Sequence, residues 1–512
     1  MTANFYITSP IYYVNDSPHI GHAYTSIACD AMARFHRLKS HQVFFLTGTD
    51  EHGQKVEKSA LNKEKNPQQF CDEVSQKFRD LTKTLNLSND DFIRTTEERH
   101  KKTVEKFWNI LEKNGFIYKD VYEGWYAVRD EAFYGADEIV DGKAPTGAEV
   151  TWHREESYFF RLSAFQDKLL MLYEAAPDFI RPISRHNEIV NFVKSGLKDL
   201  SISRTSFSWG IKVPNDEKHV IYVWLDALTN YLSALGFAEE SVNYKKFWND
   251  ASHSPLHIVG KDIARFHAIY WPAFLMAAEI NVPYGVYAHG WWTNEGQKIS
   301  KSVGNVIDPL TEIEWIQSFG CENATAVDYF RYFLLREVPF GNDGDYSRTH
   351  LITRVNAELV NNIGNLVQRS LAMIYKNCDA KIPAGVEHSH THIEPFIENY
   401  FKAFDDLAFD KALQAVIDFA NLVNKKFNDT APWNLKKLGK FDEMNQSLHE
   451  TAESLRLIAI LLAPFTPISA NKILDLLNVE NDKRDFTNLT DFLKVGHPIN
   501  EPKAVFPRLE IL

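Results

Sequence analysis

Residues 5–22, which read FYITSPIYYVNDSPHIGH, set the pattern for the first half of the chain. Residues 5–13 are rich in Tyr and Ile, which is typical of a buried parallel strand. The polar pair and the proline at residues 16–18 indicate a capped helix start. We expect that helix over residues 20–38 and a second apolar strand over residues 43–46. A strand, a crossover helix and a strand at this spacing predict a right-handed βαβ unit.

The same alternation returns later in the chain. Residues 256–259 and 284–288 are strand-like, and residues 263–280 between them are helical, with a bend expected at Pro272. Residues 116–203 differ, because they contain short aromatic strands and glycine turns. We therefore predict an α/β fold, in which a connective domain is inserted into a split, Rossmann-type parallel sheet.

Helical patterns dominate from about residue 355 onward. Val355, Leu359, Ile363 and Leu366 recur at spacings of four, four and three, which predicts one apolar stripe on a helix. Residues 455–462 are strongly apolar and predict a buried helix. The last third of the chain is therefore expected to be an α-helical bundle.

Composition excludes several classes of protein. The chain of 512 residues is long enough for about two to four domains. Its start lacks the features of a signal peptide, and its apolar runs are far too short to span a membrane, so we expect a cytoplasmic protein. The net charge of −12 argues against non-specific nucleic-acid binding but leaves room for a local basic face. The cysteines are widely scattered, which disfavours a disulfide framework and a thiolate zinc site: Cys29, Cys71, Cys321 and Cys378.

The segment His19-Ile20-Gly21-His22 lies between the first strand and its helix. Open α/β sheets bind ligands at this edge, and a helix N-terminus favours phosphate. The two histidines lie on one face of the first turn, so both could donate to phosphate oxygens. Gly21 leaves room for a nucleotide against the backbone. The alternative is a helix that happens to begin with two histidines.

A second segment, Lys298-Ile299-Ser300-Lys301-Ser302, lies in a polar, glycine-bearing loop after a strand. Two lysines and two hydroxyls could close over a triphosphate and stabilise the charge on a leaving pyrophosphate. Taken alone, the pentapeptide is more simply interpreted as a solvated basic loop.

Together the two segments resemble the two signature motifs of class I aminoacyl-tRNA synthetases. Further segments narrow the resemblance to the methionyl-tRNA synthetase family, and they cover nearly the whole chain: TSPIYYVN (8–15), TGTDEHG (47–53), YVWLDA (222–227), GKDI (260–263) and HGWW (289–292). The resemblance implies ATP-dependent activation of L-methionine to methionyl-adenylate. Transfer to the 3′ end of tRNA(Met), both initiator and elongator, would follow, and ATP would enter as its Mg²⁺ complex.

The resemblance also implies roles for individual residues. The residues implied to act in catalysis at the ATP phosphates are His19, His22, Lys298 and Lys301. ATP binding falls to Gly21, Gly260, Asp262, Ser300 and Arg204, although an interdomain salt bridge would also explain Arg204. Methionine binding falls to Ile11, Tyr13, Asp50, Trp224, Ala227, Tyr231, Phe266 and His267. Among these, Asp50 matches the ammonium position, and Tyr231 and His267 could direct donors at the sulfur.

The helical bundle is expected to read the anticodon. Asn365 and Arg369 are spaced by four and share a helical face that is turned away from the apolar stripe. Trp433 matches the family tryptophan on which an anticodon base stacks. Nearby lysines supply local positive charge. The alternative for Trp433 is a helix start packed in the core.

The chain departs from the family pattern in two places. Many relatives carry zinc on Cys-x-x-Cys knuckles in the inserted domain, whereas residues 126–130 contain no cysteine and His153 alone cannot make a site. We expect a knuckle without zinc, held by Trp125, Tyr134 and Trp152. Some relatives also append a dimerising C-terminal domain, for which residues after 509 leave no room, so we expect a monomer.

The expected domains follow from these patterns. They are catalytic halves at 1–116 and 204–293, an inserted connective domain at 117–203, a loop and stem-contact junction at 294–349, an anticodon bundle at 350–480, and a C-terminal segment at 481–512 that packs back on the body.

Four other functions compete with this hypothesis. Synthetases for isoleucine, valine or leucine carry a large editing insertion, for which residues 117–203 are too few. A cysteine-specific relative would need zinc ligands in its active site. A nucleotidylyltransferase that does not use tRNA would not explain the bundle with Asn365, Arg369 and Trp433. A tRNA-binding protein without catalysis would not need the intact histidine and lysine pairs.

Overall fold

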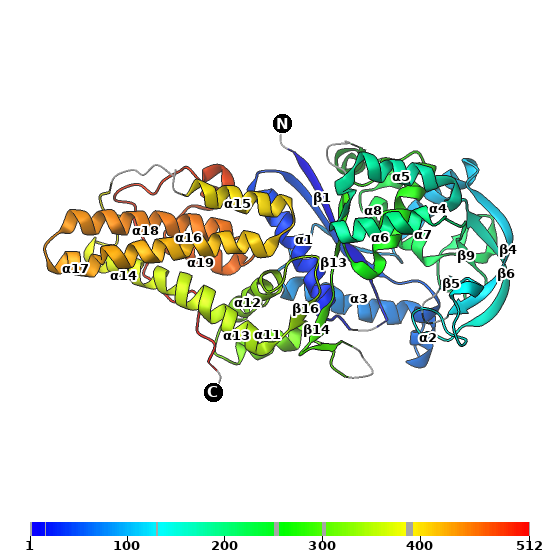
Figure 1. The fold of residues 1–512 in the computed structure, drawn as a ribbon, viewed down its shortest axis with the longest axis horizontal. Coiled ribbons are helices and arrows are strands. Elements are labelled where there is room, and N and C mark those ends of the chain that lie inside the picture. The colour runs from blue at the N-terminus through cyan, green and yellow to red at the C-terminus, as the bar shows by residue number, and fades with distance from the viewer. Residues whose placement is uncertain are drawn as a thin grey trace.

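The molecule is elongated, with an α/β part at one end and a bundle of helices at the other (Figure 1). This computed structural model describes residues 3–15, 17–127, 129, 132–249, 255–299, 304–385 and 393–510. No helix within these ranges is both long and apolar enough to cross a membrane.

A six-stranded parallel sheet forms the centre of the α/β part, in the order β3-β2-β1-β12-β13-β7. Its strands are β1 (Asn4–Tyr13), β2 (Gln42–Asp50), β3 (Asp91–Arg94), β7 (Ile180–Arg181), β12 (Leu256–Gly260) and β13 (Gly285–His289). Strand β1 pairs with β2 on one side and with β12 on the other, all in parallel. The predicted split parallel sheet is therefore confirmed. Strand β7 comes from within the stretch that we assigned to the insertion, and it forms the edge beside β13.

Helix α1 (Ile20–Leu38) has the predicted bounds but a different start. Its N-cap is His19, whose Nδ1 accepts from Gly21 N at 3.1 Å, while His22 Nδ1 accepts from His19 N at 3.1 Å. The predicted cap at residues 16–18 is therefore wrong, and Asp16 lies outside the described residues. An imidazole nitrogen here supplies the acceptor that Ser, Thr or Asp usually provides.

The expected helix over residues 263–280 is irregular in its first half. A 3₁₀ turn (η7, Lys261–Ile263) and a π-helical turn (η8, Phe266–Tyr270) precede α10 (Trp271–Ala277). Pro272 has no N–H to donate to the preceding turn, and the π-helical turn lies directly before it. The bend expected at Pro272 stays a prediction.

The remaining helices of the first half cover the sheet and its edges: α2 (Gln54–Asn62), α3 (Pro67–Thr84) and α4 (Glu98–Lys113). After the insertion come the short strands β9 (Ser203–Arg204), β10 (Lys212–Val213) and β11 (Asp216–Ile221), then α7 (Val223–Leu228) and α8 (Asn230–Ser233).

The insertion is an antiparallel sheet in the order β5-β4-β6-β8. It contains β4 (Ile117–Ala127), β5 (Ala132–Tyr134), β6 (Thr151–Phe160) and β8 (Leu200–Ser201), with α5 (Gln166–Ala175) and α6 (Ile183–Lys194). Trp125 and Tyr134 pack against a small apolar cluster, and the Trp125 ring lies 5.4 Å from that of Trp152. Among the described residues, no three His, Cys, Asp or Glu side chains gather as a metal site. The side chain of His153 and residues 128, 130 and 131 lie outside that description, so a knuckle without zinc stays a prediction.

A second small sheet lies between the catalytic sheet and the bundle, in the order β15-β14-β16. Its members are β14 (Trp292–Asn294), β15 (Gln297–Lys298) and β16 (Gly344–Tyr346), followed along the chain by α13 (Arg348–Arg354). Helices α11 (Pro309–Gln317) and α12 (Asn323–Arg336) lie between β15 and β16 in sequence.

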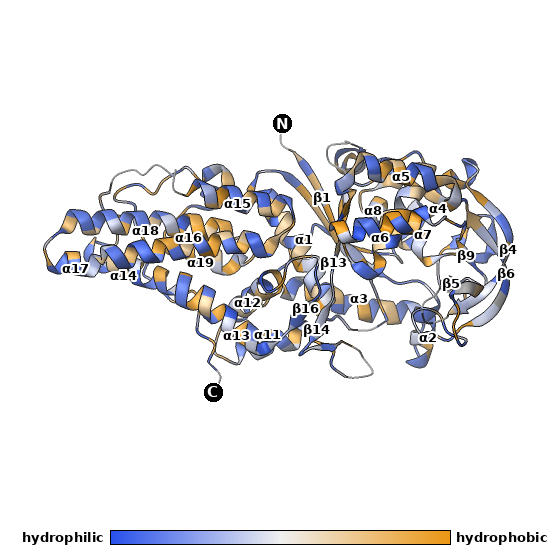
Figure 2. Ribbon diagram, viewed as in Figure 1, coloured by the Kyte–Doolittle hydropathy of each residue, from blue (hydrophilic) through white to orange (hydrophobic). Residues whose placement is uncertain are grey.

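The bundle consists of η9 (Val355–Gly364), α14 (Asn365–Asn377), α15 (Glu394–Asp405), α16 (Phe409–Thr430), α17 (Pro432–Lys437), α18 (Phe441–Leu462) and α19 (Pro467–Leu476). The predicted stripe is buried along its whole length. Its first part is π-helical rather than α-helical. In a π-helix, which has more residues per turn, residues spaced by four also lie on one face. The apolar pattern therefore does not distinguish a π-helix from an α-helix. Hydrophobic residues alternate with hydrophilic ones along much of these helices (Figure 2), whereas residues 457–462 of α18 are hydrophobic throughout.

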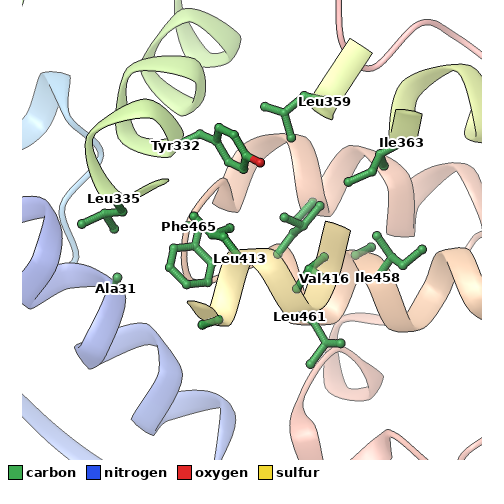
Figure 3. Close-up of a cluster of buried hydrophobic side chains, with 14 of the residues drawn as sticks. Ala31, Tyr332, Leu335, Leu359, Ile363, Leu413, Val416, Ile458, Leu461 and Phe465 are labelled. Carbon is green, nitrogen blue, oxygen red and sulfur yellow. The ribbon is translucent and has the colours of Figure 1, made fainter. Parts of the chain in front are cut away.

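The core of the bundle is continuous with the catalytic part. Side chains from α1, α12, η9, α16 and α18 meet there, including Ala31, Leu335, Leu359 and Leu461 (Figure 3). Phe35 of α1 stacks on Phe404 of α15 with ring centroids 4.0 Å apart. The two parts therefore share one hydrophobic core.

Buried arginines secure two further junctions. Arg331 lies 2.7 Å from the carboxylate of Asp30 and also donates to the carbonyls of Leu85, Pro464 and Phe465. Within the predicted buried helix over residues 455–462, Arg456 is a polar exception that we did not expect. It pairs with Glu453 and donates to the carbonyls of Asn488 and Leu489. The C-terminal segment also returns to the body, since Tyr329 OH donates to Pro507 O at 2.7 Å.

Candidate active site

A cavity of about 720 Å³ opens where the strands of the central sheet end. It lies between the carboxyl ends of β1, β2, β12 and β13 and the N-terminus of α1. In open α/β sheets, this is the position at which the strand order reverses and ligands bind. The sheet therefore places residues from both halves of the chain around one space.

Most of the residues predicted to bind ATP or methionine line this cavity. They are Ile11, Tyr13, His19, Gly21, His22, Asp50, Trp224, Ala227, Tyr231, Gly260, Asp262 and His267.

The two histidines of the first motif stack on each other, with ring centroids 3.8 Å apart. Because Nδ1 of each ring accepts a backbone N–H, each neutral ring carries its hydrogen on Nε2. Both rings are half-buried at the cavity wall. They can therefore donate hydrogen bonds to anionic oxygens beside a helix N-terminus.

Gly21 has a second reason to be glycine. A Cβ at this position would lie 3.0 Å from Cε1 of His19. The missing side chain allows the capping ring of His19 to fold over the first turn, a constraint that the sequence did not show.

Strand β1 turns its residues toward the cavity through an irregularity at Pro10. The pairing of β1 with β2 shifts register between Thr8 and Ile11. Proline has no N–H for the ladder, so a bulge here is expected. Beyond the shift Tyr13 pairs with Asp50, which brings both to the same side of the cavity.

The wall that was predicted to bind the amino acid is built from α7, α8 and η8. Tyr231 OH lies 2.7 Å from His267 Nε2, and His267 Nδ1 lies 3.0 Å from Ile263 O. Since the carbonyl can only accept, Nδ1 carries the hydrogen and Nε2 accepts from the tyrosine. Burial lowers the pKa of His267 to about 4. The Tyr231 hydroxyl thus donates to His267 and the His267 N–H donates to Ile263 O, rather than both directing donors into the cavity as we expected.

Phe266 is not among the cavity-lining residues. Its ring stacks on Trp224 at a centroid distance of 3.5 Å, nearly parallel. It therefore supports the lining ring from behind.

At the nucleotide end, a Cβ on Gly260 would lie 2.5 Å from Oδ1 of Asp262. Asp262 Oδ1 accepts from Trp291 Nε1 at 3.1 Å. Asp343 accepts from Lys261 Nζ at 2.7 Å and from Trp291 N at 2.8 Å. These contacts join the turn after β12 to the hairpin that leads to the lysine motif.

Arg204 does not reach the cavity. It is buried, donates to Ser201 Oγ and Ser203 O, and lies over the Tyr222 ring at 4.4 Å. The predicted role in ATP binding is therefore wrong for this geometry, because the guanidinium is used inside the protein at the junction of β9 with α7.

The lysine motif is described only in part. The backbone of Lys298 ends β15, and Ile299 lines the same cavity as His19. The side chain of Lys298 and residues Ser300, Lys301 and Ser302 lie outside the described residues. The hairpin of β14 and β15 therefore leads the motif to the cavity.

The three residues predicted to bind the anticodon are on α14 and α17, in the helical bundle at the other end of the molecule (Figure 1). Asn365 is exposed. The Arg369 guanidinium lies 4.9 Å from the centre of the Trp433 ring and donates to Asn428 Oδ1 at 3.0 Å. Trp433 is half-buried, so part of its ring remains at the surface.

Several cavity residues were given no role from the sequence, although His289 and Trp292 lie in the quoted segment HGWW. They are Thr25, Lys55, Asn230, His289 and Trp292. His289 Nε2 lies 2.7 Å from Thr25 Oγ1, and Lys55 Nζ lies 5.7 Å from the Tyr13 ring centre. His289 ends a strand of the parallel sheet, and that position was the available signal.

Comparisons with known proteins agree with this site. The family model of tRNA synthetases class I (M) matches residues 5–150 and 145–371, and that of the anticodon binding domain of methionyl tRNA ligase matches residues 383–510. The methionine–tRNA ligase of Rickettsia conorii is 57% identical over 100% of both chains, and that of Brucella suis is 51% identical over 98% of each. The methionyl-tRNA synthetase of Mycobacterium tuberculosis in complex with methionyl-adenylate superposes with a TM-score of 0.93 at 44% identity, over 99% of this chain and 100% of that one.

Family models thus cover almost the whole chain, and the relatives match it from end to end. The chain therefore belongs to the methionyl-tRNA synthetases, the class I family that ligates methionine to tRNA.

Proposed function

We propose that this cavity joins methionine to AMP and then passes the methionyl group to tRNA. In the first step the methionine carboxylate attacks the α-phosphate of ATP and pyrophosphate leaves. No protein nucleophile is needed, so positioning and electrostatic stabilisation supply the catalysis. One observation carries the proposal: the stacked His19 and His22, the hairpin that leads to the lysine motif, and the Tyr231–His267 wall all open onto one space.

In this proposal His19 and His22 donate from Nε2 to the ATP phosphates. Gly21 allows the cap that orients them, and Gly260 and Asp262 receive the ribose. Lys298 and Lys301, with Ser300, neutralise the β- and γ-phosphates as charge develops on the leaving pyrophosphate. Mg²⁺ enters with the phosphates and keeps most of its water ligands, as this ion usually does.

Methionine occupies the opposite end of the cavity. Asp50 pairs with its ammonium group, and Ile11, Tyr13, Trp224 and Ala227 surround its side chain. The neutral Tyr231–His267 pair faces the thioether. Phe266 acts indirectly by holding the Trp224 ring in place.

The bundle reads the anticodon of tRNA(Met), both initiator and elongator. The support is the exposed Asn365 beside Arg369 and the partly exposed ring of Trp433, since unpaired bases stack on such rings. We propose that the protein acts as a cytoplasmic monomer, with the domain boundaries predicted from its sequence, except that β7 of the inserted stretch belongs to the catalytic sheet.

Pyrophosphate exchange with ATP, measured with each of the twenty amino acids in turn, tests this function. Methionine is expected to give the fastest exchange. The proposal fails if another amino acid is preferred or if exchange does not depend on an amino acid. Aminoacylation of tRNA(Met) in the same preparation tests the second step.

A further inference from the structure

A buried cluster of ionisable side chains lies behind the amino-acid wall and has no part in the proposed chemistry. The Asp226 carboxylate accepts from His52 Nδ1 and from His100 Nε2, both at 2.7 Å. His100 Nδ1 lies 2.9 Å from Ser233 Oγ. All four side chains are buried, and the cavity is lined by other residues of α7 and α8, which carry Asp226 and Ser233, and by Asp50, two residues before His52.

Asp226 is ionised in this cluster. Burial alone would raise the pKa of its carboxyl, but the charges and hydrogen bonds of His52 and His100 outweigh burial and lower the pKa to about 2. Each carboxylate oxygen therefore has an imidazole N–H as its partner. Removing one partner of a buried charge leaves that charge uncompensated, so the three groups act as a unit.

Asp226 lies on the back of the helical segment that forms the cavity wall. Trp224, Ala227 and Tyr231 of α7 and α8 line the cavity. Asp226 follows Trp224 by two positions and therefore points about 200° away around the helix. Helices α7 and α8 are short, and such helices do not hold their position without tertiary contacts. The bonds of Asp226 thus set the rotation of this wall.

The other end of the cluster reaches the ammonium side of the cavity. His52 follows Asp50 by two residues, in the loop between β2 and α2. The residue between them is fixed as well, because Trp209 Nε1 donates to Glu51 O at 2.6 Å and Arg94 pairs with the Glu51 carboxylate at 2.7 Å. The loop that carries Asp50 is therefore held against α7 through His52.

We infer that Asp226 is a positioning residue for methionine, which fixes the distance between Asp50 and the wall of Trp224 and Tyr231 through His52 and His100. The inference rests on the proposed function of this cavity. The cluster is expected to affect methionine binding alone, because the end of the cavity proposed for ATP is built from α1, β12 and β13. A change in the cluster should therefore affect methionine and leave ATP binding intact.

The test compares the kinetics of Asp226→Asn with those of the unmodified chain in ATP–pyrophosphate exchange. The variant keeps the size of the side chain and removes its charge. We expect the KM for methionine to rise on the order of tenfold to a hundredfold, as small displacements of positioned groups do. The KM for ATP should stay unchanged, and kcat should fall much less than the KM rises.

Asp30→Asn is the matched control, because Asp30 is an equally buried, ion-paired aspartate away from the cavity. It should lower the melting temperature and leave the KM for methionine unchanged. The inference is overturned if Asp226→Asn changes neither KM, or raises both KM values alike, since either result would make the cluster purely structural.

A pair of variants at His52 keeps the test decisive if Asp226→Asn does not fold. His52→Asn retains a donor near the position of Nδ1, whereas His52→Ala removes it. Only His52→Ala should raise the KM for methionine, and equal effects of the two would refute the inference. Absence of methionine-dependent exchange in the unmodified chain would instead refute the proposed function.

Discussion

At the scale of single residues, the end of the cavity that we propose for methionine contains three buried, uncharged rings, those of Tyr231, His257 and His267. Tyr231 lies 4.2 Å from the ring of His257 and hydrogen-bonds His267. Burial lowers the pKa of both histidines, so both are neutral near pH 7. A thioether is a weak hydrogen-bond acceptor that packs well against aromatic rings, and such a wall suits it without attracting a charged side chain.

Tyr231→Phe should weaken methionine activation. The change leaves His267 Nε2 without its donor, and an unsatisfied buried acceptor costs about 1–3 kcal/mol. We expect kcat/KM for methionine in pyrophosphate exchange to fall by a corresponding amount. Tyr287→Phe is the control, because Tyr287 OH donates to Phe340 O at 2.6 Å outside the cavity. An unaltered kcat/KM in Tyr231→Phe would contradict the interpretation of this wall.

At the scale of elements, the sheet depends on one close approach between strands. A Cβ on Gly48 of β2 would lie 2.1 Å from the carbonyl oxygen of Ile93 in β3. Gly48 precedes Asp50 by two residues in the same strand. The spacing of β2 and β3 is therefore coupled to the position of the Asp50 carboxylate, which we propose binds the ammonium group of methionine.

Gly48→Ala should disrupt this edge of the sheet, because the backbone of β3 must move away to admit the methyl group. We expect lower soluble yield, a lower melting temperature and loss of exchange activity. Gly285→Ala in β13 makes the same change where the nearest atom, Phe179 O, is 3.3 Å away, and it should be tolerated. If the two variants behave alike, close approach of the strands is not the reason for Gly48.

The helices show which parts of the fold could be predicted from the sequence. The helix expected over residues 20–38 has the bounds of α1, and it was predicted from a start signal just before it and from its place between two strands. The π-helical turns of η8 and η9 could not be predicted, since spacings of four suit both helix types. The His19 cap was missed because a histidine is a rare N-cap and a better-known polar cap preceded it.

The candidate site was predictable to the extent that it lies in short motifs. His19, Gly21 and His22 are adjacent in sequence, so their shared face follows from the helix alone. Lys55, Asn230 and His289 reach the cavity only through packing between distant elements. Arg204 is the opposite case. Its position in the sequence matches a family motif, but its side chain is buried and donates to Ser201 instead of reaching the cavity.

At the scale of the whole molecule, α12 lies between the catalytic part and the bundle with two buried carboxylates nearby. Asp30 has two arginine partners, and although burial opposes them they lower its pKa to about 2. Asp328 receives one hydrogen bond, from Ser469 N at 2.6 Å, and burial raises its pKa to about 6. The two carboxylates therefore affect stability in opposite directions.

Asp328→Asn should gain stability relative to the unmodified chain as pH rises from about 4 to 6. The native pKa exceeds the ordinary 3.8, so over this range the native state retains a proton that the unfolded state loses, and unmodified Asp328 loses stability, by on the order of 2–3 kcal/mol. Asp30→Asn should lose stability at neutral pH, and its deficit should shrink as pH falls from about 4 toward 2. Melting temperatures across pH measure both, and parallel curves for the two variants would contradict the assignment.

The cavity lies in the α/β part and α17 in the bundle at the other end of the molecule, so a change at α17 should affect the step that uses tRNA and not the activation of methionine. Trp433→Ala should reduce aminoacylation of tRNA(Met), since stacking of a base is worth about 1–3 kcal/mol. It should leave methionine-dependent pyrophosphate exchange unchanged, which serves as the internal control. A fall in both reactions would show that the variant disturbs the shared core instead, where the Trp433 ring lies 5.8 Å from Phe427.

The guanidinium of Arg331 binds backbone from residues 85 and 464–465 as well as the carboxylate of Asp30. If the chain were divided anywhere between α1 and the bundle, the buried guanidinium of Arg331 would lose some of its hydrogen-bond acceptors. Neither half is then expected to mature alone. Truncation of the helical bundle is consequently expected to abolish catalysis as well, although it changes no residue of the cavity.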